Sequence, residues 1–113
     1  MSETKTADQL IYQAASILGR VVAGEALGQP EYDTINDSVD DVLSEVEQIV
    51  FISDRDEIPS RLFQTLARLL AVHVASKFSN VPLDLGQIAV HEQRLRYLAA
   101  QPSTYEPLKG EYY

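Results

Sequence analysis

The sequence predicts an all-α protein, a small four-helix bundle followed by an extended C-terminal tail. Four segments of the 113 residues carry apolar side chains at helical spacing, and no segment shows a sustained strand-like alternation. Short stretches rich in glycine, proline and aspartate separate the segments, which is typical of helices that pack as a bundle. We therefore expect a helical bundle domain at residues 1–100 and an extended tail at residues 101–113.

The first helix is predicted to begin after Thr6, because Thr6 and Gln9 have the spacing of a capping box. One side of this helix is apolar and is expected to face the core: Leu10, Ala14, Ile17, Leu18 and Val21. The glycine-containing stretch at residues 23–29 is predicted to be a loop.

The second helix is predicted to begin at Pro30, since proline suits a first helical turn. Its apolar stripe consists of Ile35, Val39, Val42, Leu43, Val46 and Val50. The opposite face is acidic and consists of Asp33, Asp37, Asp40 and Asp41, with Ser44 beside them. Residues 50–60 are predicted to be the helix end and an ordered loop with room for a short extended piece.

The third helix, at residues 59–78, is the most apolar of the four and is predicted to be the central one. Its apolar residues cover more than half of its circumference: Leu62, Phe63, Leu66, Leu69, Leu70, Val74 and Phe78. Asp84 is predicted to cap the last helix, and Pro102 to end helical structure. The last helix is expected to turn Ile88, Leu95, Leu98 and Ala99 inward and Gln93, Arg94 and Arg96 outward.

Charge is distributed unevenly along the chain, whose formal net charge is −8. Residues 25–57 hold eleven acids and one base, whereas residues 58–100 hold five bases and two acids. One interpretation is that the acids form a solvated face that keeps the protein soluble. The other is that the acidic side of one subunit meets the basic side of the next in a head-to-tail ring.

Composition excludes several functions. A chain this acidic is not expected to bind nucleic acid through its phosphates, because that binding needs clustered cations. There is no cysteine to form a disulfide, a thiolate nucleophile or a zinc ligand. No signal peptide and no membrane span is recognised, so we expect a soluble protein that does not contact a membrane and is intracellular when made.

No motif indicates an enzyme. His73 is expected in the middle of the apolar face of its helix, as a core histidine bonded to a neighbour, and His91 at the border of the inward face. The stretch "HEQRL" lacks the second histidine of a zinc-protease helix, because Leu95 occupies that position. We therefore predict no catalytic residue, no metal site and no cofactor. An enzyme that uses His73 or His91 in a pocket is the weakest alternative.

Taken in order, four stretches resemble the head-to-tail adaptors of phages, which include the packaged-DNA stabilisation proteins and tail accessory factors of short-tailed phages. The stretches are "ADQLIYQAASILGRVVAGE", "EYDTINDSVDDVLSEV", "DEIPSRLFQTLARLLAVHVASKF" and "EQRLRYL" before an aromatic tail. The connector proteins of long-tailed phages are similar as well, and the resemblance spans nearly the whole chain. It implies an all-helical core, no catalysis, and a ring of usually twelve copies docked on the portal protein at the head–tail interface of the virion.

The resemblance also implies what each part of the chain does. Relatives grip the portal with extended C-terminal segments, and the matching residues here are Tyr105, Leu108, Tyr112 and Tyr113. Tail or nozzle proteins would bind below the ring, which would assemble in the host cytoplasm. Genomic DNA would pass through the lumen without specific binding. We hypothesise that the acidic face lines this channel, because it would repel the phosphates.

A second reading remains open from the residues alone. An acidic helical bundle is also suited to be a regulatory or antitoxin-like protein that mimics DNA and masks a basic partner. Such a protein would bind its partner in a steeply salt-dependent manner.

Overall fold

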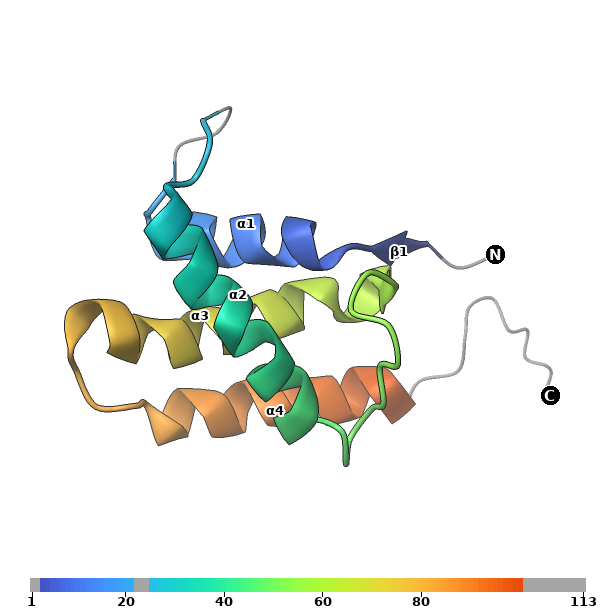
Figure 1. Cartoon of the computed structure of the whole chain (residues 1–113). Coiled ribbons are helices and arrows are strands. Elements are labelled where there is room, and N and C mark those ends of the chain that lie inside the picture. The colour runs from blue at the N-terminus through green and yellow to red at the C-terminus, as the bar shows by residue number, and fades with distance from the viewer. Residues whose placement is uncertain (1–2, 22–24, 101–113) are drawn as a thin grey trace, which may run out of the picture.

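The computed structural model describes residues 3–21 and 25–100 and consists of four helices with a minor two-stranded ribbon. The elements are β1 (Thr4–Lys5), α1 (Ala7–Ile17), α2 (Gln29–Glu45), β2 (Ile58–Pro59), α3 (Ser60–Ser79) and α4 (Leu85–Ala100). Helices α1, α3 and α4 lie roughly side by side, and α2 crosses them obliquely (Figure 1). The predicted small all-α bundle is confirmed. The predicted tail at residues 101–113 lies outside the described residues.

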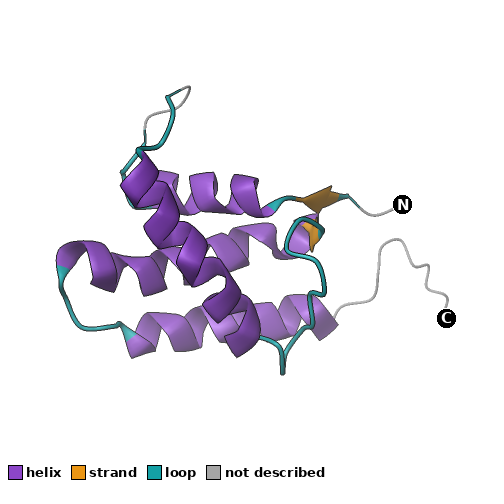
Figure 2. Cartoon of the chain, in the orientation of Figure 1, coloured by secondary structure: helices purple, strands orange, loops and turns teal. Residues whose placement is uncertain are grey.

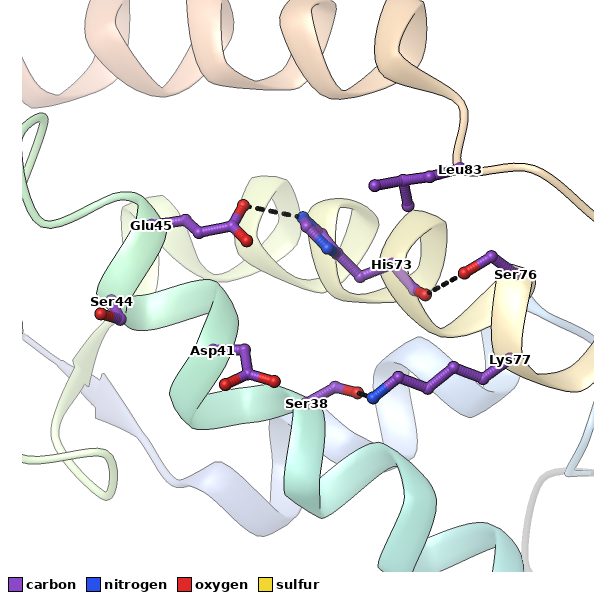
Figure 3. A pocket seen from close by; sticks show the side chains of 8 residues that line it. All are labelled: Ser38, Asp41, Ser44, Glu45, His73, Ser76, Lys77 and Leu83. Carbon is purple, nitrogen blue, oxygen red and sulfur yellow. Dashed lines mark hydrogen bonds and ion pairs between the residues drawn. The ribbon is translucent and has the colours of Figure 1, made fainter.

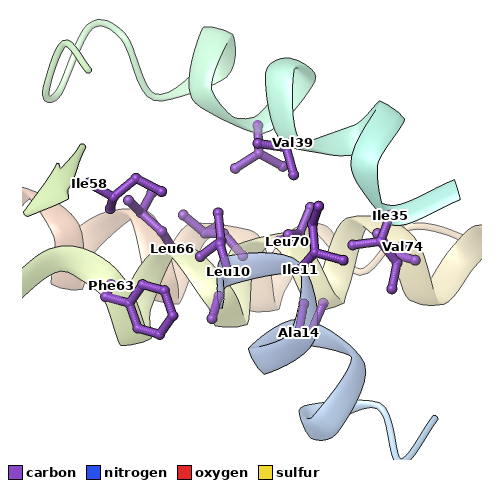
Figure 4. Packing of buried hydrophobic residues seen from close by; sticks show 14 of the residues in the cluster. Leu10, Ile11, Ala14, Ile35, Val39, Ile58, Phe63, Leu66, Leu70 and Val74 are labelled. Atoms are coloured by element: carbon purple, nitrogen blue, oxygen red, sulfur yellow. The ribbon is translucent and has the colours of Figure 1, made fainter. Parts of the chain in front are cut away.

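Helix α3 is the centre of the bundle, as its apolar circumference predicts. It packs against α1, α2 and α4, and its buried residues face all three. Figure 4 shows Leu66 and Leu70 of α3 gathered with Leu10 and Ile11 of α1 and with Val39 of α2. All five of these side chains are at most 1% exposed. Burial of this apolar surface is the main source of stability in a domain of this size.

The start of α1 follows from its predicted capping box. Thr6 Oγ1 accepts from the Gln9 backbone N–H at 3.2 Å, and the Gln9 side chain accepts from the Thr6 N–H at 2.9 Å. The end of α1 is a Schellman motif: Gly19, at a φ of 73°, donates to Ser16, and Arg20 donates to Ala15 at 2.8 Å. Glycine is needed at this position because other residues are strained at a positive φ.

The predicted core face of α1 is partly wrong. The buried residues of the helix are Ala7, Leu10, Ile11, Ala14 and Ala15, whereas Ile17 is 44% exposed. Leu18 and Val21, which lie beyond the last helical residue, are only partly buried. The buried side is centred on the residues from Ala7 to Ala15, which puts Ile17 at its edge in the last turn. Because the helix ends at Ile17, the helical wheel does not apply to Leu18 and Val21.

Helix α2 begins with Pro30 in its first turn, as predicted, and ends at Glu45. Ile35, Val39 and Val42 are buried, and Val46 is buried just after the helix. Residues 46–49 continue as turns and leave Val50 only partly buried. The apolar stripe therefore points inward along the whole helix, which turns its acidic side to solvent.

Two short strands that the sequence analysis did not predict as a pair lie at one end of the bundle (Figure 2). β1 and β2 are antiparallel, with Thr4 opposite Pro59 and Lys5 opposite Ile58. The Ser60 N–H donates to the Glu3 carbonyl at 3.1 Å, and the Ala7 N–H donates to the Asp56 carboxylate at 3.1 Å. These bonds hold the N-terminal segment against the start of α3.

The connection between α3 and α4 is short. Asn80 ends α3 in the left-handed conformation, at a φ of 52°. Asp84 accepts from the Gln87 N–H at 3.1 Å, so its predicted role as the cap of α4 is confirmed. Only Ile88 and Leu95 of α4 are buried, and the helix packs mainly against α3. Among the described residues, no element packs against the other side of α4.

Among the helices of the described residues, none has the length and apolar character that crossing a bilayer requires.

Candidate functional site

The acidic face of α2 is exposed, as predicted. Asp33, Asp37, Asp40 and Asp41 all point to solvent. Asp33 accepts from the Gln29 side chain at 2.8 Å, and Arg55 from the following loop pairs with Asp40 at 3.2 Å. Within the described part of the chain, Asp37 and Asp41 make no ion pair. Asp33 makes no ion pair there either, since its partner Gln29 is uncharged, so three carboxylates of this face keep an unpaired charge.

A cleft of about 460 Å³ lies beside the acidic face, between α2, α3 and the loop that connects α3 to α4. We call it the α2–α3 cleft. Figure 3 shows its walls: Ser38, Asp41, Ser44 and Glu45 from α2, His73, Ser76 and Lys77 from α3, and Leu83 from the loop. Two carboxylates, two nitrogen bases, three hydroxyls and one apolar side chain thus face the same space. The cleft is mixed in charge and lined mostly by polar groups.

Two contacts across the cleft fasten α2 to α3. Lys77 Nζ donates to Ser38 Oγ at 2.7 Å, and Ser38 Oγ donates to the Thr34 carbonyl at 3.3 Å. These two bonds satisfy the Ser38 hydroxyl inside the protein. Because Ser38 is only 1% exposed, the hydroxyl is not accessible as a nucleophile. Glu45 Oε1 lies 3.4 Å from His73 Nε2. After these contacts, Asp41 is the carboxylate of the cleft that makes no ion pair among the described residues.

His73 does not lie where the sequence analysis predicted. Instead of the middle of the apolar face, it lies at the edge of the cleft with a side chain 13% exposed, and its neighbour is the Glu45 carboxylate. The position is polar because α2 crosses α3 obliquely and brings Glu45 over this turn of α3 (Figure 3). Among the described residues, no three histidine, aspartate or glutamate side chains gather in a way that would hold a metal ion.

His91 is partly buried at the border between the inward and outward faces of α4, as predicted. Burial lowers the pKa of His91 below its usual value of 6.5, and the positive charge of Arg68 on α3 lowers it further. The fold therefore favours the neutral imidazole, and protonation of His91 opposes folding.

We expect the His91→Gln variant to lose less stability on acidification than the natural chain. The pKa of His91 is lower in the folded protein than in the unfolded chain, so the unfolded chain binds the proton more tightly. The contribution of neutral His91 to stability is therefore fully present above the unfolded pKa, and it is lost as the pH falls from there through the folded pKa. Thermal unfolding at a series of pH values from about 7.5 to about 5.5 measures the difference, since carboxylates titrate mostly below this range. An identical pH dependence in the two proteins would contradict this assignment.

The outward side of α4 carries apolar side chains in addition to the predicted arginine. Val90 is 59% exposed and Tyr97 is 55% exposed, and they are seven residues apart on the same side of the helix. The Arg94 guanidinium lies 5.3 Å from the centre of the Tyr97 ring. We call Val90, Arg94 and Tyr97 the α4 strip. Leu85, at the start of α4, is 70% exposed, and Val81 and Leu83 in the preceding loop are exposed as well.

Sequence analysis missed the apolar part of the α4 strip. Val90 and Tyr97 lie on the polar side of the helix, so they make its amphipathic pattern weaker. Their spacing of seven residues could have indicated that the two side chains lie on the same side of the helix.

The four residues assigned to portal docking, Tyr105, Leu108, Tyr112 and Tyr113, lie outside the described residues. Comparison of the chain with models of protein families, with functionally described proteins and with solved structures found no match.

Proposed function

We propose that this protein is a structural head-to-tail adaptor of a phage. In this proposal, about twelve copies of the chain form a ring beneath the portal protein. The ring extends the DNA channel, retains the packaged DNA and joins the head to tail or nozzle proteins. It acts at the head–tail interface of the virion after assembly in the host cytoplasm, and it is not an enzyme.

The observation that carries the proposal is the outer side of α4, which no other element of the described residues covers. A single small domain buries most large apolar side chains, yet Val90 and Tyr97 on this side are more than half exposed. Apolar and aromatic side chains that share one face are typical of surfaces that bind other proteins. Together with the resemblance of nearly the whole chain to phage adaptors, this supports an assembly role.

The acidic face fits the passage of DNA through such a ring. Asp37 and Asp41 are exposed and make no ion pair with described residues, so they present net negative charge to whatever lies in front of them. DNA phosphates are repelled by such a surface, whereas a basic lumen would hold the genome in place. We place this face on the channel wall. A structure of the assembled ring with the acidic face on its outer surface would overturn this part of the proposal.

Deletion of residues 103–113 is expected to abolish binding to the portal ring. The deleted segment contains Tyr105, Leu108, Tyr112 and Tyr113, and aromatic anchors contribute a large share of binding energy. Co-sedimentation with purified portal rings measures docking, and circular dichroism measures helical content, which the deletion should leave unchanged. A triple variant with alanine at the three tyrosines serves as the matched control for chain length. Unimpaired docking of the deletion variant would contradict the role of the tail, and absence of the protein from purified virions would refute the adaptor function.

The exposed acids also favour a second candidate, a regulatory or antitoxin-like protein that mimics DNA. Its acidic helix would bind a basic protein partner, and affinity would fall steeply as salt is added. Charge inversion at Asp33 and Asp37 would abolish that binding. The adaptor proposal instead places the tail, and not the acidic face, on the portal. The tail deletion and the charge inversion therefore separate the two functions.

A further inference from the structure

No element of the described residues covers the α4 strip. α4 is anchored to α3 through Ile88 and Leu95, and Val90 and Tyr97 project from the other side of the helix. The strip therefore faces away from the described part of the bundle. The chemistry of the strip indicates what kind of partner it fits. Val90 and the Tyr97 ring offer apolar surface, and the Arg94 guanidinium offers five N–H donors. A matching surface carries carboxylates or other hydrogen-bond acceptors next to some apolar area.

The α2–α3 cleft has the complementary chemistry. Asp41 offers two acceptor oxygens and makes no ion pair among the described residues, and Ser44 and Glu45 add further acceptors on the same wall. Lys77 is the ammonium group of the cleft and is directed at Ser38 Oγ at 2.7 Å, and the two carboxylates of Asp41 and Glu45 outnumber it. Leu83, which is 39% exposed, supplies apolar surface at the rim.

We infer that the α4 strip of one copy binds the α2–α3 cleft of a second copy. In this contact the Arg94 guanidinium pairs with the Asp41 carboxylate, which lies where the acidic face borders the cleft. Asp33, Asp37 and Asp40 then remain on the channel wall. The apolar surface of Val90 and Tyr97 covers Leu83. Pairing of Arg94 with a carboxylate offsets the cost of removing both charges from water. This inference deepens the proposed function and rests on it, because it names the two surfaces that join neighbouring subunits.

The contact is head to tail, since two different surfaces of the same chain meet. Each bound copy leaves one free strip at one end of the assembly and one free cleft at the other, so further copies add until the rotation closes a ring. A two-fold contact of α4 with α4 would instead stop at a dimer. It would also bring the Arg94 side chains of the two copies close together, and repulsion between the two positive charges disfavours that arrangement.

Two variants that each disable one surface test this inference. The strip variant carries Arg94→Ala and Tyr97→Ala, and the cleft variant carries Asp41→Lys and Ser44→Ala; all four positions are exposed. Sedimentation of the full-length chain over a range of concentrations should show association that each variant weakens more than tenfold. The strip variant loses its cation and its ring, and the cleft variant opposes Arg94 with a second cation. The mutated strip carries no charge, so it cannot pair with the mutated cleft. An equimolar mixture should form a one-to-one heterodimer and nothing larger, since only one functional strip and one functional cleft remain per pair.

Matched charge changes outside the two surfaces are the controls. Arg68→Ala on α3 changes the net charge as the strip variant does, and Asp33→Lys at the start of α2 changes it as the cleft variant does. Both controls should leave association unchanged. A second measurement detects weak contacts: the chain has no cysteine, so Tyr97→Cys and Ser44→Cys chains can be mixed under oxidising conditions. The disulfide-linked heterodimer should exceed both homodimers.

Three results would overturn the contact: no heterodimer with either method, equal association of the strip variant and the natural chain, or preferential Tyr97→Cys homodimers. The last of these would indicate a two-fold α4 contact. Portal binding is measured separately. A chain that docks on portal rings but gives no strip-to-cleft cross-link, even there, keeps the proposed function and loses this contact. A chain that associates as described but binds no portal keeps the contact and loses the function.

Discussion

Replacing Leu70 with alanine is expected to lower the free energy of unfolding by about 2–5 kcal/mol. Leu70 is fully buried at the centre of α3, where it contributes to the cluster formed with α1 and α2 (Figure 4). The substitution removes apolar contact area and leaves a cavity that three packed helices cannot fully close. Since the whole domain is stabilised by only about 5–15 kcal/mol, this is a large part of the total. Urea denaturation followed by circular dichroism measures the change.

The matched control is Gln64→Ala, an exposed position on the same helix. It should change stability by no more than about 0.5 kcal/mol, because it removes no buried surface. If Leu70→Ala were as mild as Gln64→Ala, the packing of α3 as the central helix would be contradicted.

The beginnings of the helices were predictable because their signals are local. Thr6 and Gln9, three residues apart, form the capping box of α1, and Pro30 lies in the first turn of α2. Asp84 caps α4 by accepting from the N–H of Gln87, three residues further on. In each case the side chains that satisfy the free backbone groups lie within one turn of them. These signals located the beginnings of α1, α2 and α4, and the start predicted for α3 at residue 59 is one residue from Ser60.

The pairing of β1 with β2 was not predictable in the same way. Lys5 and Ile58 are far apart in the chain, and each strand is only two residues long, too short for an alternating pattern. What joins them is a set of long-range bonds, such as that from Ala7 to the Asp56 carboxylate. Sequence analysis allowed a short extended piece near Ile58 but had no means to identify its partner.

The acidic face could be predicted from a local pattern, whereas the α2–α3 cleft depends on contacts between distant parts of the chain. Exposure of Asp33, Asp37, Asp40 and Asp41 follows from the period of one helix, so it was predicted correctly. The cleft depends on the angle at which α2 crosses α3, which brings Glu45 to His73 and Ser38 to Lys77. A helical wheel contains no information about that angle. It therefore placed His73 in an apolar environment and did not reveal the polar contacts between the two helices.

Replacing Leu95 with aspartate is expected to detach α4 from the bundle. Leu95 is fully buried, and it and Ile88 are the two buried residues that hold α4. An aspartate here loses the contacts of the leucine and places a carboxylate in an apolar site, where it must either be protonated or pull the helix into water. Truncation of a buried leucine costs about 2–5 kcal/mol, and the free energy of unfolding should fall by at least this amount here. Because α4 packs mainly against α3, local opening of α4 should exceed that of α1 and α2.

Val90→Asp on the same helix separates anchoring from docking. Val90 is 59% exposed, so this variant should keep the stability of the natural chain within about 0.5 kcal/mol and still lose association with a second copy. Amide hydrogen exchange distinguishes the two: Leu95→Asp should accelerate exchange throughout residues 85–100 while α1 and α2 stay protected, and Val90→Asp should not. Equal destabilisation by both would mean that the outer side of α4 is packed within the monomer, which would remove the basis for a contact between copies.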